Sequence, residues 1–454
     1  MDTKKLRQKI LDLAIHGKLV PQDPNDEPAS VLLERIKAEK ERLVKEGKIK
    51  RSKKSAKTSD TPHYGNVLPD GWRLSTLGEV FTLQAGKNIT AKDIKDIATE
   101  LHPYKCYGGN GVRGFVASYN REGDFPIIGR QGALCGNINI AKGKFYATEH
   151  AVVVERYCDV DLMWTYYTLT ALNLNQYATA TAQPGLSVAV INDVCIPIPP
   201  QKEQERISKE MERWFAFIDQ IEQSKADLQT AIKQAKSKIL DLAIHGKLIP
   251  QDPNDEPAIE LLKRINPDFT PCDNGHYAQL PDGWCYATIK EAFIINPKNK
   301  ADDDIEVGFV PMANITDGYN NTFKYETKRW GKIKTGFTHF ANGDIAVAKI
   351  SPCLENRKSV VLKGLPNGIG AGTTELHVFR SLFLDVQYGL NFFKSDYFIS
   401  QCVGSFNGVV GQQRVSKNII ENMIIAIPPI NEQKRIACAV HNIFAKLDMI
   451  MESL

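Results

Sequence analysis

The sequence predicts an α+β protein in which two mixed helix–strand domains are separated by a pair of long antiparallel coiled-coil helices, in a cyclic pseudo-two-fold arrangement. The first observation is a near-perfect repeat. Lys9–Ala29 recurs as Lys238–Ala258 with one change, Val20 to Ile249, at an offset of 229 positions. The second observation is an apolar heptad pattern in the middle of the chain, and the third is a strand-rich composition on both sides of it. A long internal period indicates two copies of one structural unit.

The repeat also predicts how the ends of the chain relate to its middle. At the same offset, Leu454 corresponds to Lys225 and Met1 corresponds to Thr230. We therefore expect the C-terminal segment to point toward the N-terminal segment in space. Together the two would rebuild what the middle of the chain makes in one piece.

The middle piece is predicted to be one long helix. No Pro or Gly lies between Glu203 and His245, and Gly246 then supplies a helix stop. Apolar residues spaced alternately by four and three predict a coiled-coil seam, interrupted by Lys225. The seam residues are Ile207, Met211, Trp214, Ile218, Ile221, Leu228, Ile232, Ile239 and Leu242 in the middle of the chain, and Ile436, Val440, Ile443, Leu447 and Ile450 near its end. We expect each stripe to pack on its pseudo-symmetric mate; the alternative is that each helix packs on its neighbouring globular domain.

Two segments of different character lie between the helical pieces. Each opens with Leu-Pro-Asp-Gly-Trp, at Leu68–Trp72 and Leu280–Trp284, and each closes with an Ile-Pro-Pro type of exit into a helix. Short apolar runs and many Gly, aromatic and β-branched residues predict strands in both. The predicted boundaries are 1–58 for an N-terminal helical region with a basic linker, 59–200 for the first mixed domain, 201–266 for the central long helix, 267–429 for the second mixed domain and 430–454 for the C-terminal helix.

Composition bounds the class of protein. The chain has 454 residues, 43% hydrophobic content and a net charge of +4, which fits a soluble protein of three or four structural units. No apolar run approaches the ~18 residues of a membrane span, and nine Cys occur without a Cys-x-x-Cys pair. We therefore expect a cytoplasmic protein with reduced thiols. Lys48–Lys57 holds six basic residues in ten and predicts a linker that either contacts phosphates or only aids solubility.

Signatures of catalysis are missing from the sequence. There is no Gly-x-x-x-x-Gly-Lys-Ser/Thr phosphate loop and no Gly-x-Gly-x-x-Gly after a predicted strand. The pair Glu149-His150 lacks the second His of a zinc-binding helix and lies beside a predicted strand, which favours a structural role. Glu375 and His377 occupy a comparable place in the second segment. We expect no catalytic residue, no metal site and no cofactor.

Polar residues beside Gly and Pro in both segments suit hydrogen bonding to nucleic acid. Arg pairs well with guanine and Asn or Gln with adenine, whereas Lys suits phosphates. The candidate DNA-binding residues are Arg130 and Gln131 in the first segment and Lys349, Asn356, Arg357, Lys358, Gln412, Gln413 and Arg414 in the second. For each of them the alternative is an ordinary surface-loop residue.

The whole chain resembles the specificity (S) subunit of type I restriction-modification systems. The resemblance rests on the two helical regions, the two unlike segments and the exit motif into a long helix. Motifs inside the segments add to it: Ile128–Ala133 with Tyr146–His150 is similar to one common type of target-recognition domain, and Pro352–Lys358 with Gly372–Val378 resembles another.

This resemblance implies two α/β target-recognition domains that read the two halves of a split, asymmetric double-stranded DNA target. The coiled coil is then a ruler that sets the gap between the halves. The resemblance also implies a non-catalytic chain whose partners are two modification (methyltransferase) subunits and the restriction (motor-nuclease) subunits, which methylate adenine or cleave. Two alternatives stay open: a specificity subunit of a related methyltransferase or phage-defence complex outside type I, and a coiled-coil scaffold without DNA contact.

Overall fold

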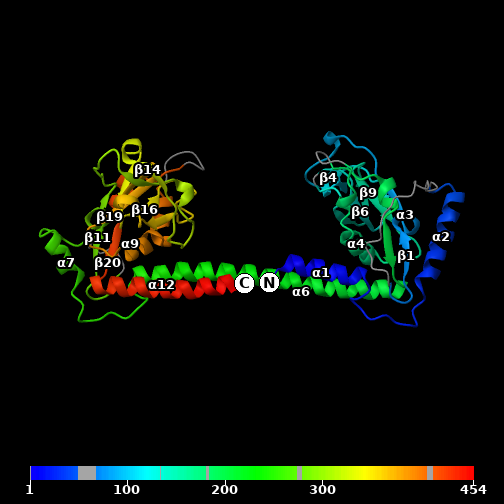
Figure 1. The fold of residues 1–454 in the computed structure, drawn as a ribbon, viewed down its shortest axis with the longest axis horizontal. Helices are drawn as coiled ribbons and strands as arrows, with labels where there is room; N and C mark the ends of the chain where they lie inside the picture. Colours follow the sequence, from blue (N-terminus) through cyan, green and yellow to red (C-terminus); the bar gives the residue numbers. More distant parts are fainter. Residues whose placement is uncertain are drawn as a thin grey trace. The chain divides into compact units, whose positions relative to one another are not determined.

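Two compact units make up the chain, Met1–Ser224 and Lys225–Leu454. The structure, a computed structural model, describes residues 2–49, 68–132, 134–179, 184–272, 279–405 and 413–453. Both units mix helices and sheets, and one long helix runs from the first into the second (Figure 1). The predicted α+β class and the long helix are therefore confirmed, whereas the five predicted domain boundaries stay a prediction. Among the described residues, no helix has the length and apolar character needed to cross a bilayer.

The first unit contains two four-stranded sheets and a two-stranded ladder. Its helices are α1 (Thr3–Ile15), α2 (Ala29–Lys45), α3 (Leu77–Val80), α4 (Leu162–Ala171), α5 (Val188–Asn192) and the first part of α6 (Gln201–Ile244). Its strands are β1 (Arg73–Thr76), β2 (Thr82–Ala85), β3 (Tyr104–Gly108), β4 (Gly111–Val116), β5 (Arg121–Glu122), β6 (Phe125–Gly129), β7 (Ile138–Ala141), β8 (Lys144–Ala147), β9 (Ala151–Glu155) and β10 (Cys195–Ile198). The sheets have the orders β2-β9-β6-β7 and β4-β3-β8-β5, and β1 pairs with β10.

The second unit repeats this plan. Its helices are the remainder of α6, α7 (Ala258–Ile265), α8 (Ile289–Ala292), α9 (Val386–Phe393), α10 (Asp396–Val403), α11 (Lys417–Glu421) and α12 (Ile430–Ser453). Its strands are β11 (Cys285–Thr288), β12 (Phe293–Ile295), β13 (Glu306–Val310), β14 (Glu326–Arg329), β15 (Thr338–Ala341), β16 (Ile345–Ala348), β17 (Ser359–Val361), β18 (Ile369–Gly372), β19 (Leu376–Ser381) and β20 (Ile424–Ile427). The sheets have the orders β12-β19-β16-β17 and β14-β13-β18-β15, and β11 pairs with β20.

The two units share one sheet topology. In each, the second sheet holds a parallel pair, β3 with β8 and β13 with β18, among antiparallel neighbours. In each, a capping box opens the short helix after the first strand, built by Thr76 with Glu79 and by Thr288 with Glu291. Strand β6 therefore corresponds to β16, and β9 corresponds to β19.

A glycine explains why the helix ends and the Leu-Pro-Asp-Gly-Trp motif recur together. Gly17 follows α1 with a φ of +63°, a left-handed conformation that suits glycine. A Cβ at this position would lie 2.4 Å from Pro69 Cγ and 3.1 Å from the ring of Trp72. Gly246 after α6 is built in the same way, with a φ of +67° and a would-be Cβ 2.3 Å from Pro281 Cγ. The helix end and the motif form one packed junction in each unit.

A buried glutamate closes the same junction. The Trp72 ring nitrogen donates to Glu203 Oε2 at 3.0 Å, and Gln22 Nε2 donates to Oε1 at 3.1 Å. Glu203 is 1% exposed, and burial raises the pKa of its carboxyl above the usual value.

The second unit builds this junction from Trp284, Gln251 and Glu432, at the same two distances and with the same direction of pKa shift. The repeated sequence therefore encodes a repeated hydrogen-bond network.

In the first unit, α1 runs antiparallel to α6. The Arg7 guanidinium donates to Asp219 at 2.5 Å and to Glu222 at 3.2 Å, and it lies 5.2 Å from the centre of the Phe215 ring. The other end of α1 leads to Gln22, which bonds to Glu203 near the start of α6.

In the second unit, α12 runs antiparallel to the remainder of α6. The Lys236 ammonium is buried, forms an ion pair with Asp448 and lies 5.0 Å from the centre of the Phe444 ring. After the end of α6, Gln251 donates a hydrogen bond to Glu432 near the start of α12.

The predicted seam residues differ in burial. Buried are Ile207, Met211, Ile218, Ile232, Ile436 and Val440; half-buried are Ile221, Ile239, Leu242, Ile443 and Leu447. Trp214, Leu228 and Ile450 are 41%, 38% and 45% exposed, which corrects their place in a buried seam. Phe215 replaces Trp214 at the contact with α1. A helix of 3.6 residues per turn drifts away from a strict heptad, which accounts for such one-residue shifts.

Both expected kinds of helix packing, on another helix and on the neighbouring domain, occur within the units. The buried residues of α6 in the first unit belong to the same apolar core as Trp72 and Trp164 of the sheet-containing part. In the second unit, Leu240 and Ile244 of α6 share a core with Phe293. Each part of the long helix thus packs on a helix and on its neighbouring domain.

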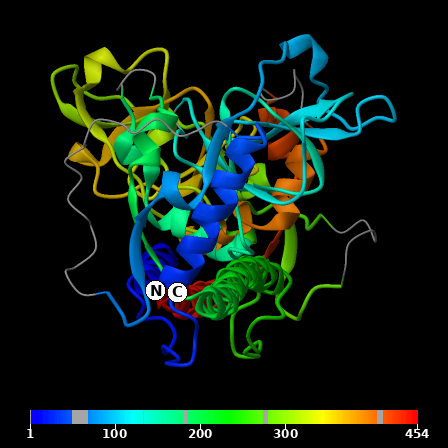
Figure 2. The same cartoon turned by 90° about the vertical axis from the view of Figure 1, so that its right-hand side faces the viewer.

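Helix α2 distinguishes the first unit from the second. It spans 17 residues, whereas its counterpart α7 spans 8, and Figure 2 shows α2 in front of the strands of its unit. Lys40 Nζ donates to the carbonyl oxygens of Gly78 and Phe81 at 2.6 and 2.8 Å, which fastens α2 to the end of α3. Most of the predicted basic linker Lys48–Lys57 lies outside the described residues.

Candidate nucleic-acid interface

The end of β6 presents the first candidate residue, Arg130. Its backbone amide donates to the carbonyl of His150 at 2.8 Å, and its own carbonyl accepts from the amide of Leu186 at 2.9 Å. The guanidinium Nε donates to the carbonyl of Leu186 at 3.1 Å, so the half-buried side chain is held along the loop before α5. Gln131, the next residue, is exposed and pairs through its backbone with Gly185.

Lys349 occupies the same position in the second unit. Its amide donates to the carbonyl of Glu375 at 2.9 Å, and its carbonyl accepts from the amide of Val415 at 3.0 Å. A cation therefore stands at the end of the equivalent strand in both units, flanked by the residue before β9 or β19 and by the loop before α5 or α11. Sequence reasoning selected both cations without knowing that they correspond.

The two surroundings differ in charge. Glu375, the counterpart of His150, forms a two-pronged ion pair with the Arg414 guanidinium at 2.8 and 3.0 Å. This guanidinium lowers the pKa of Glu375 below its usual value. Gln413 accepts from the amide of Ser351 at 2.9 Å through its carbonyl, and Gln412 lies outside the described residues. The structure brings Lys349, Glu375 and Arg414 together at this end of β16.

Three other candidates lie further along the loop between β16 and β17. The Arg357 guanidinium forms an ion pair with Asp396, stacks 4.9 Å from the centre of the Tyr319 ring and is 16% exposed. Lys358 is equally covered, with its ammonium 3.7 Å from Asp317.

Arg357 and Lys358 therefore have acidic partners inside the unit, and a contact of either residue with DNA stays a prediction. Asn356 is exposed beside them, and its carbonyl accepts from the amide of Gly318 at 2.8 Å.

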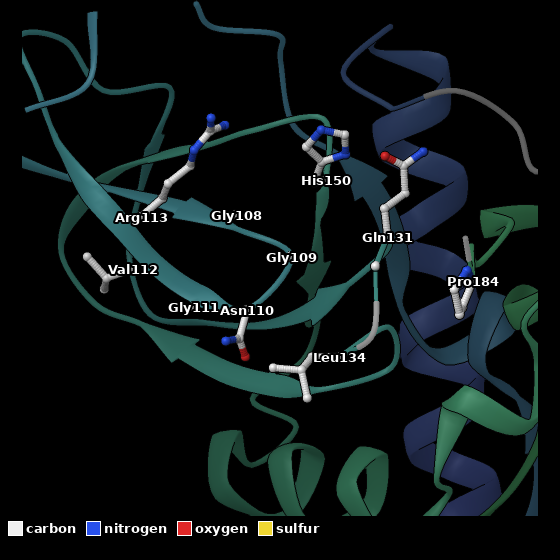
Figure 3. A pocket seen from close by; sticks show the side chains of 11 residues that line it. Gly108, Gly109, Asn110, Gly111, Val112, Arg113, Gln131, Leu134, His150 and Pro184 are labelled. Atoms are coloured by element: carbon white, nitrogen blue, oxygen red, sulfur yellow. The ribbon is translucent and has the colours of Figure 1, made fainter. Parts of the chain in front are cut away.

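An open hollow of about 700 Å³ adjoins the end of β6 in the first unit. Its wall comes from the turn between β3 and β4, the loop after β6 and the residue before β9. The lining residues include Gly109, Asn110, Arg113, Gln131, Leu134 and His150. In Figure 3, Arg113, Gln131 and His150 extend to the same side of the hollow. Sequence reasoning missed Arg113; the run Gly108–Gly111 was the available signal, because it predicts a tight turn beside open space.

Glu149 and His150, for which a structural role was expected, lie side by side just before β9. His150 Nε2 lies 3.1 Å from Glu149 Oε1, and the His150 carbonyl holds the amide of Arg130. His150 also lines the hollow, which the sequence did not indicate. In the described part of the chain, no three His, Cys, Asp or Glu side chains gather as a metal site.

Comparison with known proteins gives a family match over most of the chain. The family model described as Type I restriction modification DNA specificity domain matches residues 69–230 and 281–453. The EcoEI type I restriction enzyme specificity subunit of Escherichia coli is 43% identical over 242 residues, 49% of this chain and 40% of that protein. The EcoAI specificity subunit of Escherichia coli is 42% identical over 240 residues, 48% of this chain and 40% of that protein. The matches thus span about two fifths of the length of these relatives.

Two solved structures share the fold. The HsdS subunit from Thermoanaerobacter tengcongensis superposes with a TM-score of 0.50 at 14% identity, covering 86% of this chain and 93% of the other. A chain from a study of complex assembly and conformational transition of the type I R-M system gives a TM-score of 0.53 at 15% identity, covering 85% and 93%. At such low identity these likenesses concern the fold alone.

Proposed function

This chain belongs to the type I restriction modification DNA specificity family, and from that premise we propose that it is the sequence-reading subunit of a type I restriction-modification complex. It reads a bipartite, asymmetric double-stranded DNA target, with one target-recognition domain for each half. The chain itself is non-catalytic and acts in the cytoplasm. Its partners are two modification subunits, which methylate adenine at the target, and restriction subunits, which cut DNA that lacks the methyl group.

One observation carries this proposal. The two units have the same packed junctions and the same sheet topology, but the side chains around the ends of β6 and β16 differ. The junctions at Glu203 and Glu432 have the same hydrogen bonds, and a cation stands at the end of β6 and of β16. Around these cations the side chains differ, with His150 in one unit and Glu375 in the other. Different hydrogen-bonding groups on an equivalent scaffold suit two readers with different sequence preferences.

Mapping of methylated adenines tests the proposal. The chain is produced together with the modification subunit of its own system in a host that lacks adenine methylation, and every methylated site is located. We expect one recurring target made of two different short sequences at a constant gap. Methylation without a recurring target, or a target that is one continuous sequence, would contradict the proposal.

Duplex binding gives a second readout that needs no catalysis. Because Lys and Arg release counterions from DNA, the affinity of the complex for a target duplex should fall steeply with salt. Affinity independent of salt would speak for a scaffold that makes no DNA contact.

A further inference from the structure

The floor of the hollow in the first unit is made of backbone. A Cβ at Gly129 would lie 1.9 Å from the carbonyl oxygen of Gly109, and a Cβ at Gly109 would lie 2.9 Å from that of Gln131. Two chain segments, the turn after β3 and the end of β6, therefore meet without side chains between them. Gly132, which has a φ of +91°, would point a Cβ into open space. Such a floor admits a flat group close to the backbone.

Two hydrogen-bond donors stand at the rim. Arg113 on β4 and Gln131 after β6 are exposed, and they extend to the same side of the hollow (Figure 3). Within the described ranges, no carboxylate lies within ion-pair distance of Arg113. Arg113 differs in this respect from Arg357, whose guanidinium forms an ion pair with Asp396. Arg113 thus keeps its charge and its planar set of donors for a ligand.

A third group at the rim presents an acceptor. His150 Nε2 lies 3.1 Å from Glu149 Oε1. An ionised carboxylate only accepts hydrogen bonds, so the neutral tautomer of His150 that pairs with it carries its proton on Nε2. In that tautomer, Nδ1 carries the lone pair and is the ring atom left for a ligand. Oε2 of Glu149 is buried and has no hydrogen-bond partner in the part of the chain described.

The hollow thus offers donors and an acceptor side by side. A phosphate has only acceptor oxygens and a negative charge, which the neighbouring Glu149 carboxylate opposes. A purine presents N7 and either O6 or an amino group along its major-groove edge, which suits Arg113 for guanine and Gln131 for adenine. The amino group of adenine, or of the cytosine opposite guanine, is a donor for His150 Nδ1.

We propose that this hollow reads the edge of one purine-containing base pair in the half-target of the first recognition domain. Arg113 and Gln131 contact the base edge, and Glu149 is a positioning residue that sets the proton of His150. This inference rests on the proposed function. It assigns to Arg113 the role of determining specificity at a single position.

Binding competition with substituted duplexes tests the assignment. The full chain in complex with its modification subunit is challenged with duplexes that carry each base pair in turn at every position of the mapped target. For Arg113→Ala we expect discrimination to fall about 10- to 100-fold at one position of one half and to stay unchanged elsewhere. Arg113→Lys, which keeps the charge but not the planar fork, should lose the same discrimination. For Gln131→Ala we expect a loss at that same position.

Lys142→Ala is the matched control. Lys142 is exposed just after β7, where Ala141 pairs with Phe125 at the opposite end of β6, and the substitution removes one positive charge. It should leave discrimination intact. A uniform loss of affinity in Arg113→Ala at all sequences, with a smaller salt dependence, would indicate a phosphate contact and overturn the inference. Unchanged discrimination in Arg113→Ala would overturn it as well.

Glu149 is tested by rescue. Glu149→Ala should weaken discrimination at the same position, and Glu149→Gln should restore it, because the Gln carbonyl still accepts from His150 Nε2. Equal losses in both variants would reject a positioning role. Failure of the wild-type complex to prefer any sequence is a different result, since it would reject the proposed function itself.

Discussion

At the scale of single residues, the buried glutamates Glu203 and Glu432 hold the repeated frame together. Each accepts from a tryptophan and a glutamine through separate oxygens, so both oxygens are satisfied inside the protein. Burial raises the pKa of both carboxyls, which means that ionisation costs free energy in the folded state. The two hydrogen bonds offset part of that cost.

We expect Glu203→Gln to destabilise the protein by about 1–3 kcal/mol. A neutral Gln has one acceptor oxygen, so either Trp72 or Gln22 would face an amino group instead. Glu432→Gln should cost about the same, because its contacts are the same. Urea unfolding measures both, with Glu205→Gln, an exposed position on α6, as the control. A neutral effect of both substitutions would contradict the role of these hydrogen bonds, and a neutral effect of only one would contradict the equivalence of the two junctions.

The buried side chain of Lys394 should make the stability of the protein depend on pH. Burial, and secondarily the nearby Arg357 guanidinium, lower the pKa of Lys394 to about 7. Between that value and the ordinary 10.5, the unfolded chain holds the proton more tightly than the folded one. The contribution of Lys394 to stability is therefore present above pH 10.5, falls as the pH decreases and is lost below about 7.

Lys394→Met should flatten this part of the curve. The variant loses the bonds from Nζ to the carbonyls of Gly318 and Arg357, so its stability is lower throughout and the slope is the informative quantity. Unfolding free energies measured between pH 7 and 10 test this, with the exposed Lys363→Met as control. An unchanged slope in Lys394→Met would show that Lys394 keeps an ordinary pKa in the folded protein.

The candidate site was only partly predictable at this scale. Arg130 and Lys349 follow short apolar runs and precede Gly or Pro, so a local pattern marks them as the ends of strands. Arg357 carries the same kind of local signal, but its pairing with Asp396 joins positions 39 apart. Arg113 lies in the hollow because the turn after β3 packs on Gly129, another contact between distant positions. No spacing in the sequence encodes either contact.

At the scale of elements, α6 was predictable because its pattern is long and uninterrupted. The absence of Pro and Gly between Glu203 and His245 allows one helix of 44 residues. The exposed side of the helix was less predictable. Trp214 fits the heptad spacing, yet Phe215 faces the Arg7 guanidinium, because side chains on α1 and α4 decide which aromatic ring is covered. The sheet orders were also beyond a sequence pattern, since strands of two to six residues pair over long separations.

The account of α6 as a spacer makes a prediction about length. Four alanines inserted within Ala226–Gln229, where the side chains are exposed and the repeat has no counterpart, add about 6 Å of helix. We expect the gap between the two half-targets to grow by about two base pairs, at 3.4 Å each, while both half-sequences persist. Mapping of methylated adenines measures the gap. Replacing these four residues by four alanines keeps the length and is the control, and an unchanged gap in the insertion variant would reject the spacer role.

At the scale of the whole molecule, one unit is used twice. The repeated 21 residues predicted this, and the shared sheet topology extends it to segments that have little sequence in common. The frame keeps its sequence because Gly17, Trp72 and Glu203 each fill a junction that tolerates few alternatives. The residues around the ends of β6 and β16 differ, with His150 in one unit and Glu375 in the other, as two readers of different sequences would require.

Exchange of one recognition segment tests this claim most directly. In the chimera, residues 285–427 are replaced by the corresponding segment of another family member, and the methylated target is mapped with the original modification subunit. We predict that one half of the target changes to that of the donor, while the other half and the gap remain. A chimera that folds but changes both halves, or neither, would contradict the account.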